Sequence, residues 1–125
     1  MSKNTAIVTG DFHNSFVYNN LKCYPKGKQR DKLDYFPELV VPSITSANYD
    51  EEFTIPQTNE YLAMYYKQNP DLVWADLNAH GYLLMKFDEK NMSATFKFSE
   101  SILKPSDKKL PDVNFSGGTR MFKDK

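Results

Sequence analysis

The sequence predicts a mixed α/β fold that is mostly strand, with one helix and a β-hairpin near its end. Short apolar runs and alternating apolar residues, both typical of strands, recur along the chain, whereas only residues 58–69 have clear helical spacing. The 125 residues are enough for one domain with a modest core, and an aromatic content of 14% supplies large side chains to fill it. As an isolated piece, such a chain is closer to an α+β arrangement.

The first predicted strand is residues 5–9, "TAIVT", a continuous apolar run with β-branched residues that is typical of a strand buried on both faces. Residues 19–37 are polar and basic and contain Pro and Gly, so we predict a long loop there. A second strand is predicted within residues 38–47. Pro42 either ends this strand or places it at a sheet edge, because proline lacks the N–H that the ladder needs.

A helix of about three turns is predicted from Thr58, a suitable N-cap, to the Asn69-Pro70 pair, which stops it. One helix can cover only one side of a β layer. The other side would be bare, so we expect the chain to be dimeric or one piece of a larger fold.

Residues 81–99 are predicted to form a β-hairpin with a polar turn at residues 88–91. Its second strand has a clear alternation in which the apolar positions are Met92, Ala94, Phe96 and Phe98. From residue 104 the chain is polar and rich in Pro, Gly and Lys. We therefore expect residues 104–125 to be a loosely ordered tail after a domain of residues 1–103.

Composition argues against several classes of partner. The formal net charge is zero, so there is no bulk electrostatic argument for binding nucleic acid, and we expect none. No apolar run approaches the roughly 18–20 residues of a membrane helix, so we expect no membrane span. The first residues also lack the apolar core of a secretory signal peptide. A single cysteine, Cys23, excludes an internal disulfide and a Cys-pair zinc site.

The stretch "IVTGDFHNS" carries the clearest chemistry, because Asp11 and His13 lie two positions apart directly after the first strand. If the chain stays extended there, both side chains point the same way, and Gly10 lets the backbone turn tightly. A carboxylate and an imidazole are suitable as two metal ligands, or as a base and its orienting group. Asn14 adds a neutral polar group. Alternatively, Asp11 caps a turn and His13 is solvated.

Three motifs in order resemble the C-terminal part of PhoD-like alkaline phosphatases (the alkaline phosphatase D family, in the metallophosphoesterase superfamily). They are the strand ending in Thr-Gly-Asp-x-His-x-Ser, the Glu-Leu-Val strand with the Ser-Ile-Thr-Ser block at residues 43–46, and the segment "NPDLVWADLNAHGY" before the hairpin. The resemblance covers roughly residues 5–100.

The resemblance implies a portion of a four-layer α/β/β/α sandwich that hydrolyses phosphate esters with a multi-metal centre of calcium and iron. It makes Asp11 and His13 metal ligands. Asn14 and Ser43 are then possible substrate contacts, although the Ser43 hydroxyl is also suited to satisfying backbone groups where the strand breaks. The family also implies a periplasmic, secreted or cell-surface location.

The family's other metal-binding segments precede the Gly-Asp-x-His loop. We therefore expect this chain to be a C-terminal portion or fragment that needs a complementary N-terminal half for activity. A non-catalytic interaction module and an inactive remnant are the alternatives.

Two further features have no assigned role. The second histidine, His80, is expected at the surface or at the entry to the hairpin, with no ligand role. The basic residues of the long loop either steer an anionic substrate or form a solvated loop; they are Lys22, Lys26, Lys28, Arg30 and Lys32.

Overall fold

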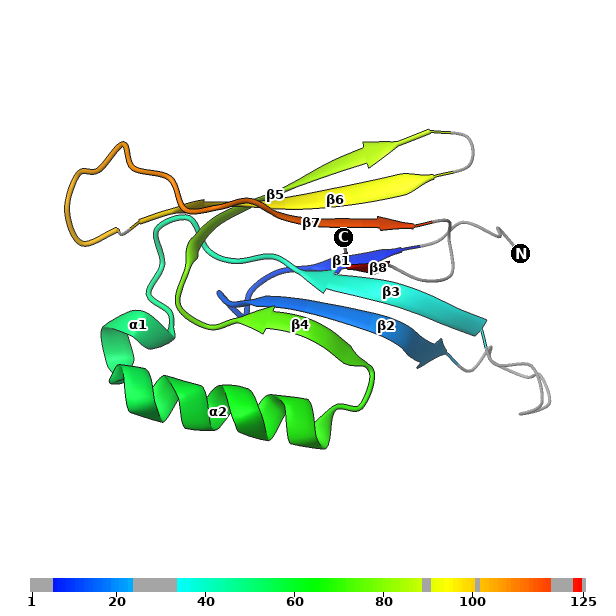
Figure 1. Ribbon diagram of the computed structural model, residues 1–125, viewed down its shortest axis with the longest axis horizontal. Helices are drawn as coiled ribbons and strands as arrows, with labels where there is room; N and C mark the ends of the chain where they lie inside the picture. Colours follow the sequence, from blue (N-terminus) through cyan, green and yellow to red (C-terminus); the bar gives the residue numbers. More distant parts are fainter. Residues whose placement is uncertain (1–5, 24–33, 89–90, 101, 118–122, 125) are drawn as a thin grey trace.

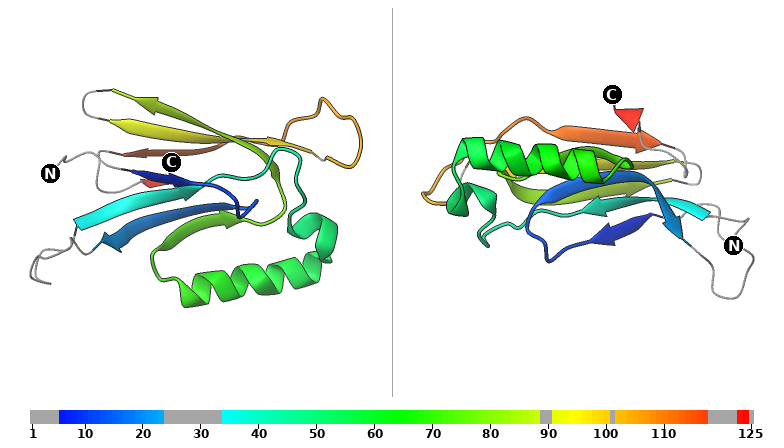
Figure 2. Two further views of the ribbon diagram at one scale, coloured as in Figure 1. Left: turned by 180° about the vertical axis from the view of Figure 1, so that it is seen from behind. Right: turned by 90° about the horizontal axis from the view of Figure 1, so that it is seen from below.

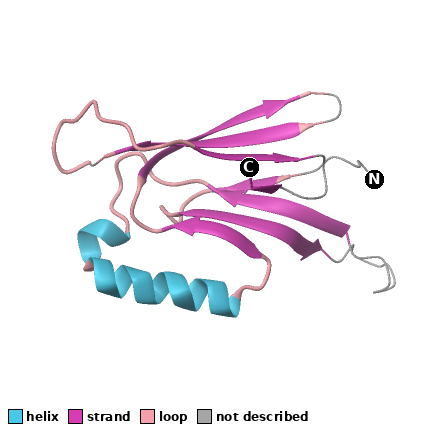
Figure 3. Cartoon of the chain, viewed as in Figure 1, coloured by secondary structure: helices cyan, strands magenta, loops and turns pink. Residues whose placement is uncertain are grey.

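Two β-sheets lie face to face, and a helix lies along the outer side of one of them (Figures 1 and 3). The computed structural model describes residues 6–23, 34–88, 91–100, 102–117 and 123–124. In this part of the chain strands predominate and helices are few, so the predicted mixed α+β character is confirmed.

The first sheet, sheet A, has the strand order β1-β3-β2-β4. Its strands are β1 (Ile7–Thr9), β2 (Ser15–Cys23), β3 (Asp34–Val40) and β4 (Leu72–Asp76). β1 pairs in parallel with β3, and β2 pairs antiparallel with β3 and with β4. The first predicted strand is confirmed as β1, but the expected burial on both faces was wrong, since Val8 is 50% exposed. Because β1 lies at an edge of sheet A, the loop of residues 10–14 leads from this edge into a central strand.

The prediction of a long loop over residues 19–37 was wrong at both ends of this range, because strands occupy them. β2 continues to Cys23 and β3 begins at Asp34, while residues 24–33, with most of the basic residues, lie outside the described part. The pairing of β2 with β3 shifts register between Tyr18 and Leu21, and such an irregularity interrupts the alternation that reveals a strand. The predicted stop near Pro42 is confirmed, since β3 ends at Val40.

The second sheet, sheet B, has the order β5-β6-β7-β8 and is antiparallel throughout. Its strands are β5 (His80–Phe87), β6 (Met92–Ser99), β7 (Val113–Gly117) and β8 (Lys123–Asp124). The predicted hairpin is confirmed as β5 and β6, with Asp88 and Asn91 bonded to each other across the turn. The alternation in β6 is also confirmed, because its four apolar positions are all buried.

The stretch expected to be a loosely ordered tail contains a strand of sheet B. β7 pairs with β6 over five residues, and the Phe115 side chain in its middle is fully buried. The polar flanks of this short strand concealed it in the sequence. The division of the chain at residue 103 as a domain boundary stays a prediction.

The helices are α1 (Tyr49–Glu52) and α2 (Ile55–Gln68). α2 begins earlier than predicted: its N-cap is Thr54, whose backbone N–H donates to the Gln57 side chain at 3.0 Å, as in a capping box. Thr58 is instead a buried residue within the helix. The predicted end is confirmed, with Asn69 as the C-cap.

Sheet A has an apolar core on each face. Val17 and Leu39 point toward sheet B and join the apolar side chains of β6 and β7, whereas Phe16 and Val40 point toward α2. Figure 2 shows α2 crossing over sheet A in the view from below. The side of sheet A that we expected to be bare is therefore covered by sheet B of the same chain.

The outer face of sheet B is largely polar, although Tyr82 and Leu84 of β5, which lie opposite Lys97 and Thr95, are also exposed. Its exposed or half-exposed residues include Ser93, Thr95 and Lys97, with hydrogen bonds from Thr95 to the Asn114 side chain and from Lys97 to Asp112. An antiparallel sheet with one apolar and one polar face commonly has solvent on the polar side. The described residues thus form three layers: α2, sheet A and sheet B.

Gly81 permits a close approach between β5 and β6. A Cβ atom added to Gly81 would lie 1.9 Å from the backbone oxygen of Lys97 and 3.0 Å from the Cα of Phe98. Both are backbone atoms, so no side-chain rotation can relieve the overlap. The absence of a side chain at residue 81 therefore fixes how the entry to β5 meets β6.

We expect Gly81→Ala to lower the free energy of unfolding by about 1–3 kcal/mol or more, because overpacking forces the backbone to shift. Chemical denaturation followed by circular dichroism measures the change. Gly10→Ala is a matched control: a Cβ atom there has no neighbour within 4 Å, so the change should stay within about 0.5 kcal/mol. Equal effects of the two substitutions would contradict the close approach.

We expect Phe115→Ala to destabilise the fold by about 3–5 kcal/mol, which is the usual loss for a buried phenylalanine. Asn114→Ala removes an exposed side chain from the same strand and should change stability by less than about 1 kcal/mol. The same denaturation experiment applies. If Phe115→Ala left stability unchanged, β7 would not belong to the core.

Candidate functional site

The loop of residues 10–14 is not extended, as the sequence argument assumed. Asp11 and His13 have positive φ angles of 71° and 67°, in the left-handed region that Asp and His enter more readily than most residues. The rule that residues two apart share one side of a strand therefore does not apply to this pair. Asp11 is exposed, and the Phe12 ring packs on Phe16, with ring centroids 5.4 Å apart, while staying 47% exposed.

The His13 ring is oriented by a backbone carbonyl. Its Nδ1 lies 2.8 Å from the oxygen of Ala47. A carbonyl oxygen can only accept, so Nδ1 carries the proton and the neutral ring keeps a lone pair on Nε2. Metal-binding histidines are commonly held in this way, with one ring nitrogen donating to a carbonyl and the other binding the ion. This contact therefore leaves Nε2 of the neutral His13 ring as the nitrogen with a free lone pair.

Asn14 holds the loop from inside. Its side-chain nitrogen donates to the Phe12 oxygen at 3.1 Å, and the residue is only 1% exposed. Its Oδ1 is buried without a hydrogen-bond partner among the described residues, and so is the Ser15 hydroxyl. The structure therefore places Asn14 behind the loop and not on its exposed side.

Ser43 joins the loop to the entry of β5. Its backbone N–H donates to the His13 oxygen at 3.0 Å, and its own oxygen accepts from the Gly81 N–H at 2.9 Å. Its hydroxyl donates to the Ser46 oxygen and lies 3.2 Å from Nδ1 of His80. These contacts agree with the expectation that the hydroxyl serves local groups where the strand ends.

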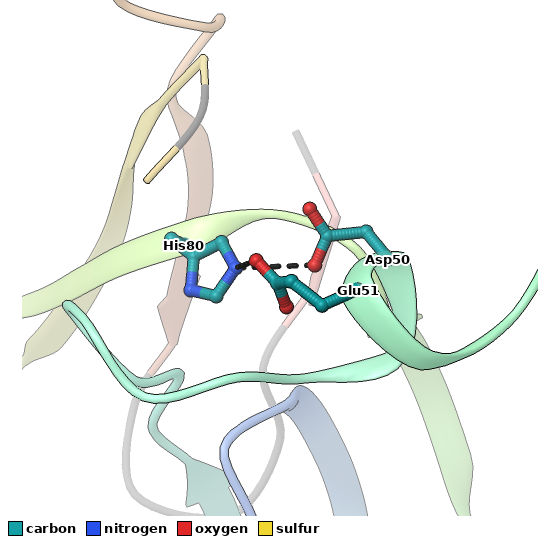
Figure 4. A group of neighbouring side chains, drawn as sticks. All are labelled: Asp50, Glu51 and His80. Atoms are coloured by element: carbon teal, nitrogen blue, oxygen red, sulfur yellow. Dashed lines mark hydrogen bonds and ion pairs between the residues drawn. The ribbon is translucent and has the colours of Figure 1, made fainter. Parts of the chain in front are cut away.

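His80, for which no ligand role was predicted, lies in a cluster with two carboxylates. It is the first residue of β5, as expected for the hairpin entry, but it is 1% exposed and not at the surface. Its Nε2 lies 2.9 Å from Oε1 of Glu51 and 3.1 Å from Oδ1 of Asp50, both on α1 (Figure 4). About 30 residues separate His80 from these partners in the chain, so no local spacing marks the cluster in the sequence.

The α1 turn is built to hold these carboxylates in place. Asn48 caps it by accepting from the Asp50 N–H, and Glu51 accepts from the Asn48 N–H at 2.8 Å. The Asn48 amide also donates to the Asn78 oxygen, which ties α1 to the loop before β5. The cap therefore fixes Asp50 and Glu51 opposite His80.

The two carboxyl groups have pKa shifts of opposite sign. Burial raises the pKa of Asp50, and the adjacent Glu51 carboxylate adds to this. Burial also acts to raise the pKa of Glu51, but the hydrogen bond from the Asn48 N–H and the interactions with Asp50 and His80 outweigh it and hold this pKa below its usual value. Such divergence is typical of two carboxyl groups that share one site.

A groove of about 400 Å³ lies between the Gly-Asp-x-His loop and α2. It is lined by Thr9, Gly10, Phe12, Phe16, Tyr18, Glu38, Val40, Tyr65 and Asn69. Four of these nine residues are aromatic, and the Glu38 carboxylate is the charged group among them. This lining is suited to an apolar or aromatic group and not to a free phosphate.

We expect the neutral ring of His13 to carry its proton on Nδ1, because the Ala47 oxygen can only accept. Long-range ¹H–¹⁵N correlation spectra of the folded chain report this directly, and the chain has only two histidines to assign. The spectrum of the chain unfolded in urea, where the Ala47 contact is absent, is the reference. A proton found on Nε2 of neutral His13 would contradict the orientation described above.

Comparison with known proteins agrees with the motifs. A family model described as PhoD-like phosphatase matches residues 1–96. Neither curated proteins nor solved structures gave a match. No helix in the described residues is long and apolar enough to span a membrane. The matched range covers sheet A, both helices and most of the β5–β6 hairpin. The chain therefore belongs to the PhoD-like phosphatase family, which implies a phosphatase-like origin and a dependence on metal.

Proposed function

We propose that this chain is a segment of a metal-dependent phosphoric ester hydrolase and that Asp11 and His13 are two of its metal ligands. The observation that carries the proposal is the orientation of His13, whose Nδ1 is bound to the Ala47 oxygen while Nε2 is left to bind an ion. The family match, which includes this loop, supports it.

The ligand types suit the metals that the family resemblance implies. An exposed carboxylate such as Asp11 is a hard oxygen ligand suited to calcium, and imidazole is a common ligand of iron. When bound, such ions polarise the phosphoryl oxygens and activate the attacking nucleophile. Gly10 has open space where a side chain would be, so a phosphate group can approach the backbone closely.

The substrate would be a phosphate ester whose organic group enters the groove beside α2. Aromatic side chains of the groove, such as Phe12, Phe16 and Tyr65, can pack against this group. The Glu38 carboxylate would repel the phosphate and so direct it toward the metal-binding loop. As part of the proposal, we retain the family's periplasmic, secreted or cell-surface location.

Phosphatase activity would need further metal ligands in addition to those of the Gly-Asp-x-His loop. A catalytic metal usually has at least three protein ligands, and the loop offers the side chains of Asp11 and His13. We therefore propose a complementary N-terminal half as the partner. β1 ends the strand order of sheet A, so its outer edge is a possible place for a further strand. The four-layer sandwich also belongs to this proposal.

The second candidate is a non-catalytic interaction module, and the small number of ligands in the loop favours it. Its expected signature is stoichiometric binding of a partner without added metal and with no turnover. An inactive remnant is less consistent with the structure, because close-packed cores lie on both sides of sheet A.

We expect hydrolysis of p-nitrophenyl phosphate or its diester when the chain is co-expressed with the N-terminal half of a PhoD-like phosphatase and supplied with calcium and iron. Asp11→Asn and His13→Gln should each lower kcat/KM by at least about 100-fold, since losing residues that only orient metal ligands already lowers activity about 10–100-fold.

Asp107→Asn is the matched control, because it removes an exposed carboxylate outside the loop and should leave the rate unchanged. Unchanged rates in both loop variants would remove Asp11 and His13 from the site. A stable complex without turnover under any metal condition would favour the interaction module.

A further inference from the structure

The Asp50–Glu51–His80 cluster has a geometry that needs a positive group at Nε2 of His80. Two carboxylate oxygens lie 2.9 and 3.1 Å from this nitrogen, and all three potential ligand atoms lie within 4.8 Å of one another. Figure 4 shows both carboxylates directed at the same ring nitrogen. A nitrogen lone pair facing two carboxylates would be repelled, so either a proton or a cation must lie between them.

The contact of Nδ1 with Ser43 determines which ring nitrogen of a neutral His80 carries the proton. The Ser43 hydroxyl uses its one hydrogen on the Ser46 oxygen, so it can only accept from Nδ1 of His80. A neutral ring therefore has its proton on Nδ1 and its lone pair on Nε2, facing the carboxylates. In that form the cluster is one imidazole and two carboxylate ligands around a common point.

We propose that Asp50, Glu51 and His80 bind a divalent first-row transition metal ion such as Zn²⁺ or Mn²⁺. In octahedral coordination with bonds of about 2.1 Å, neighbouring ligand atoms lie roughly 3.0 Å apart, and the two nitrogen–oxygen distances of the cluster are close to this value. One imidazole with two carboxylates favours such metals over Ca²⁺, which prefers oxygen ligands alone.

The cluster can be reached by an ion from solvent, and its histidine ring is held in place. The Asp50 side chain is 30% exposed, so a hydrated ion can enter from its side, whereas His80 is 1% exposed and fixed by the Ser43 hydroxyl. A metal-binding histidine usually donates its other ring N–H to a fixed acceptor, and the Ser43 hydroxyl is an acceptor at this position. This site does not rest on the proposed function, since it shares no ligand with the Gly-Asp-x-His loop.

The test is titration of the whole chain with Zn²⁺ and, separately, with Ca²⁺, at a pH above the usual imidazole pKa. Isothermal calorimetry gives stoichiometry and affinity, and NMR spectra of the two histidine rings identify the ligand. We expect one Zn²⁺ per chain to shift the His80 ring signals, and at least tenfold weaker binding of Ca²⁺.

Asp50→Asn and Glu51→Gln should each weaken Zn²⁺ binding at least tenfold. Both preserve size, and glutamine can still accept from the Asn48 N–H, so the cap of α1 is kept. Glu52→Gln, an exposed residue of the same helix, is the matched control and should bind as the unaltered chain does.

His13→Gln separates this site from the loop. Retained Zn²⁺ binding in His13→Gln supports the proposal whether or not the phosphatase assay succeeds. The proposal is overturned if only His13 signals shift, if Asp50→Asn and Glu51→Gln bind Zn²⁺ normally, or if no binding occurs below millimolar concentration. The last result would make the cluster an ion pair between protonated His80 and the carboxylates.

Discussion

The backbone segment of residues 41–48 is the constraint on which the rest of the structure depends. The Val41 N–H donates to the Thr9 oxygen and the Ser43 N–H to the His13 oxygen, which fixes the end of β1 and the loop after it. The Ser43 oxygen accepts from the Gly81 N–H at the start of β5. One short segment without regular structure thus connects the edge of sheet A to the first strand of sheet B. The same segment orients both histidine rings, His13 through the Ala47 oxygen and His80 through the Ser43 hydroxyl.

The position of this segment is maintained by packing on both faces of sheet A. Val17 and Leu39 are fully buried against sheet B, and their neighbours Phe16 and Val40 are buried against α2. Because successive strand residues point to opposite faces, a slip of one residue would exchange these two sets of side chains. The double burial therefore fixes the register of β2 and β3, and with it the positions where their connecting loops begin.

Sequence patterns predicted correctly those strands that have one polar face and those helices whose last residues include a helix-breaking signal. The alternation in β6 and the Asn69 stop of α2 were visible in the sequence for this reason. β2 and β4 were not predicted at all, and the pairing of β2 with both β3 and β4 shifts register, which breaks the regular alternation that marks a strand. β7 was missed because only one fully buried side chain, Phe115, marks it.

The two candidate sites also differ in how far they can be predicted from the sequence. Candidate ligands that are close together in the sequence, such as Asp11 and His13, can be identified from it. Their left-handed backbone conformation could not be predicted in this way. The Asp50–Glu51–His80 cluster depends on a contact between α1 and β5, and pairs this distant leave no spacing signal in one sequence.

The place of β1 in its sheet bears on motion. This strand has three residues, pairs only with β3 among the described strands, and does so in parallel, whereas β5 and β6 are paired antiparallel over eight residues. Short edge pairings open with little free energy, while pairings inside the core open only near global unfolding. The Gly-Asp-x-His loop thus has one anchor that opens easily and one in the core. On the microsecond-to-second scale of local opening, such a loop can rearrange around an incoming ion while the two sheets stay packed.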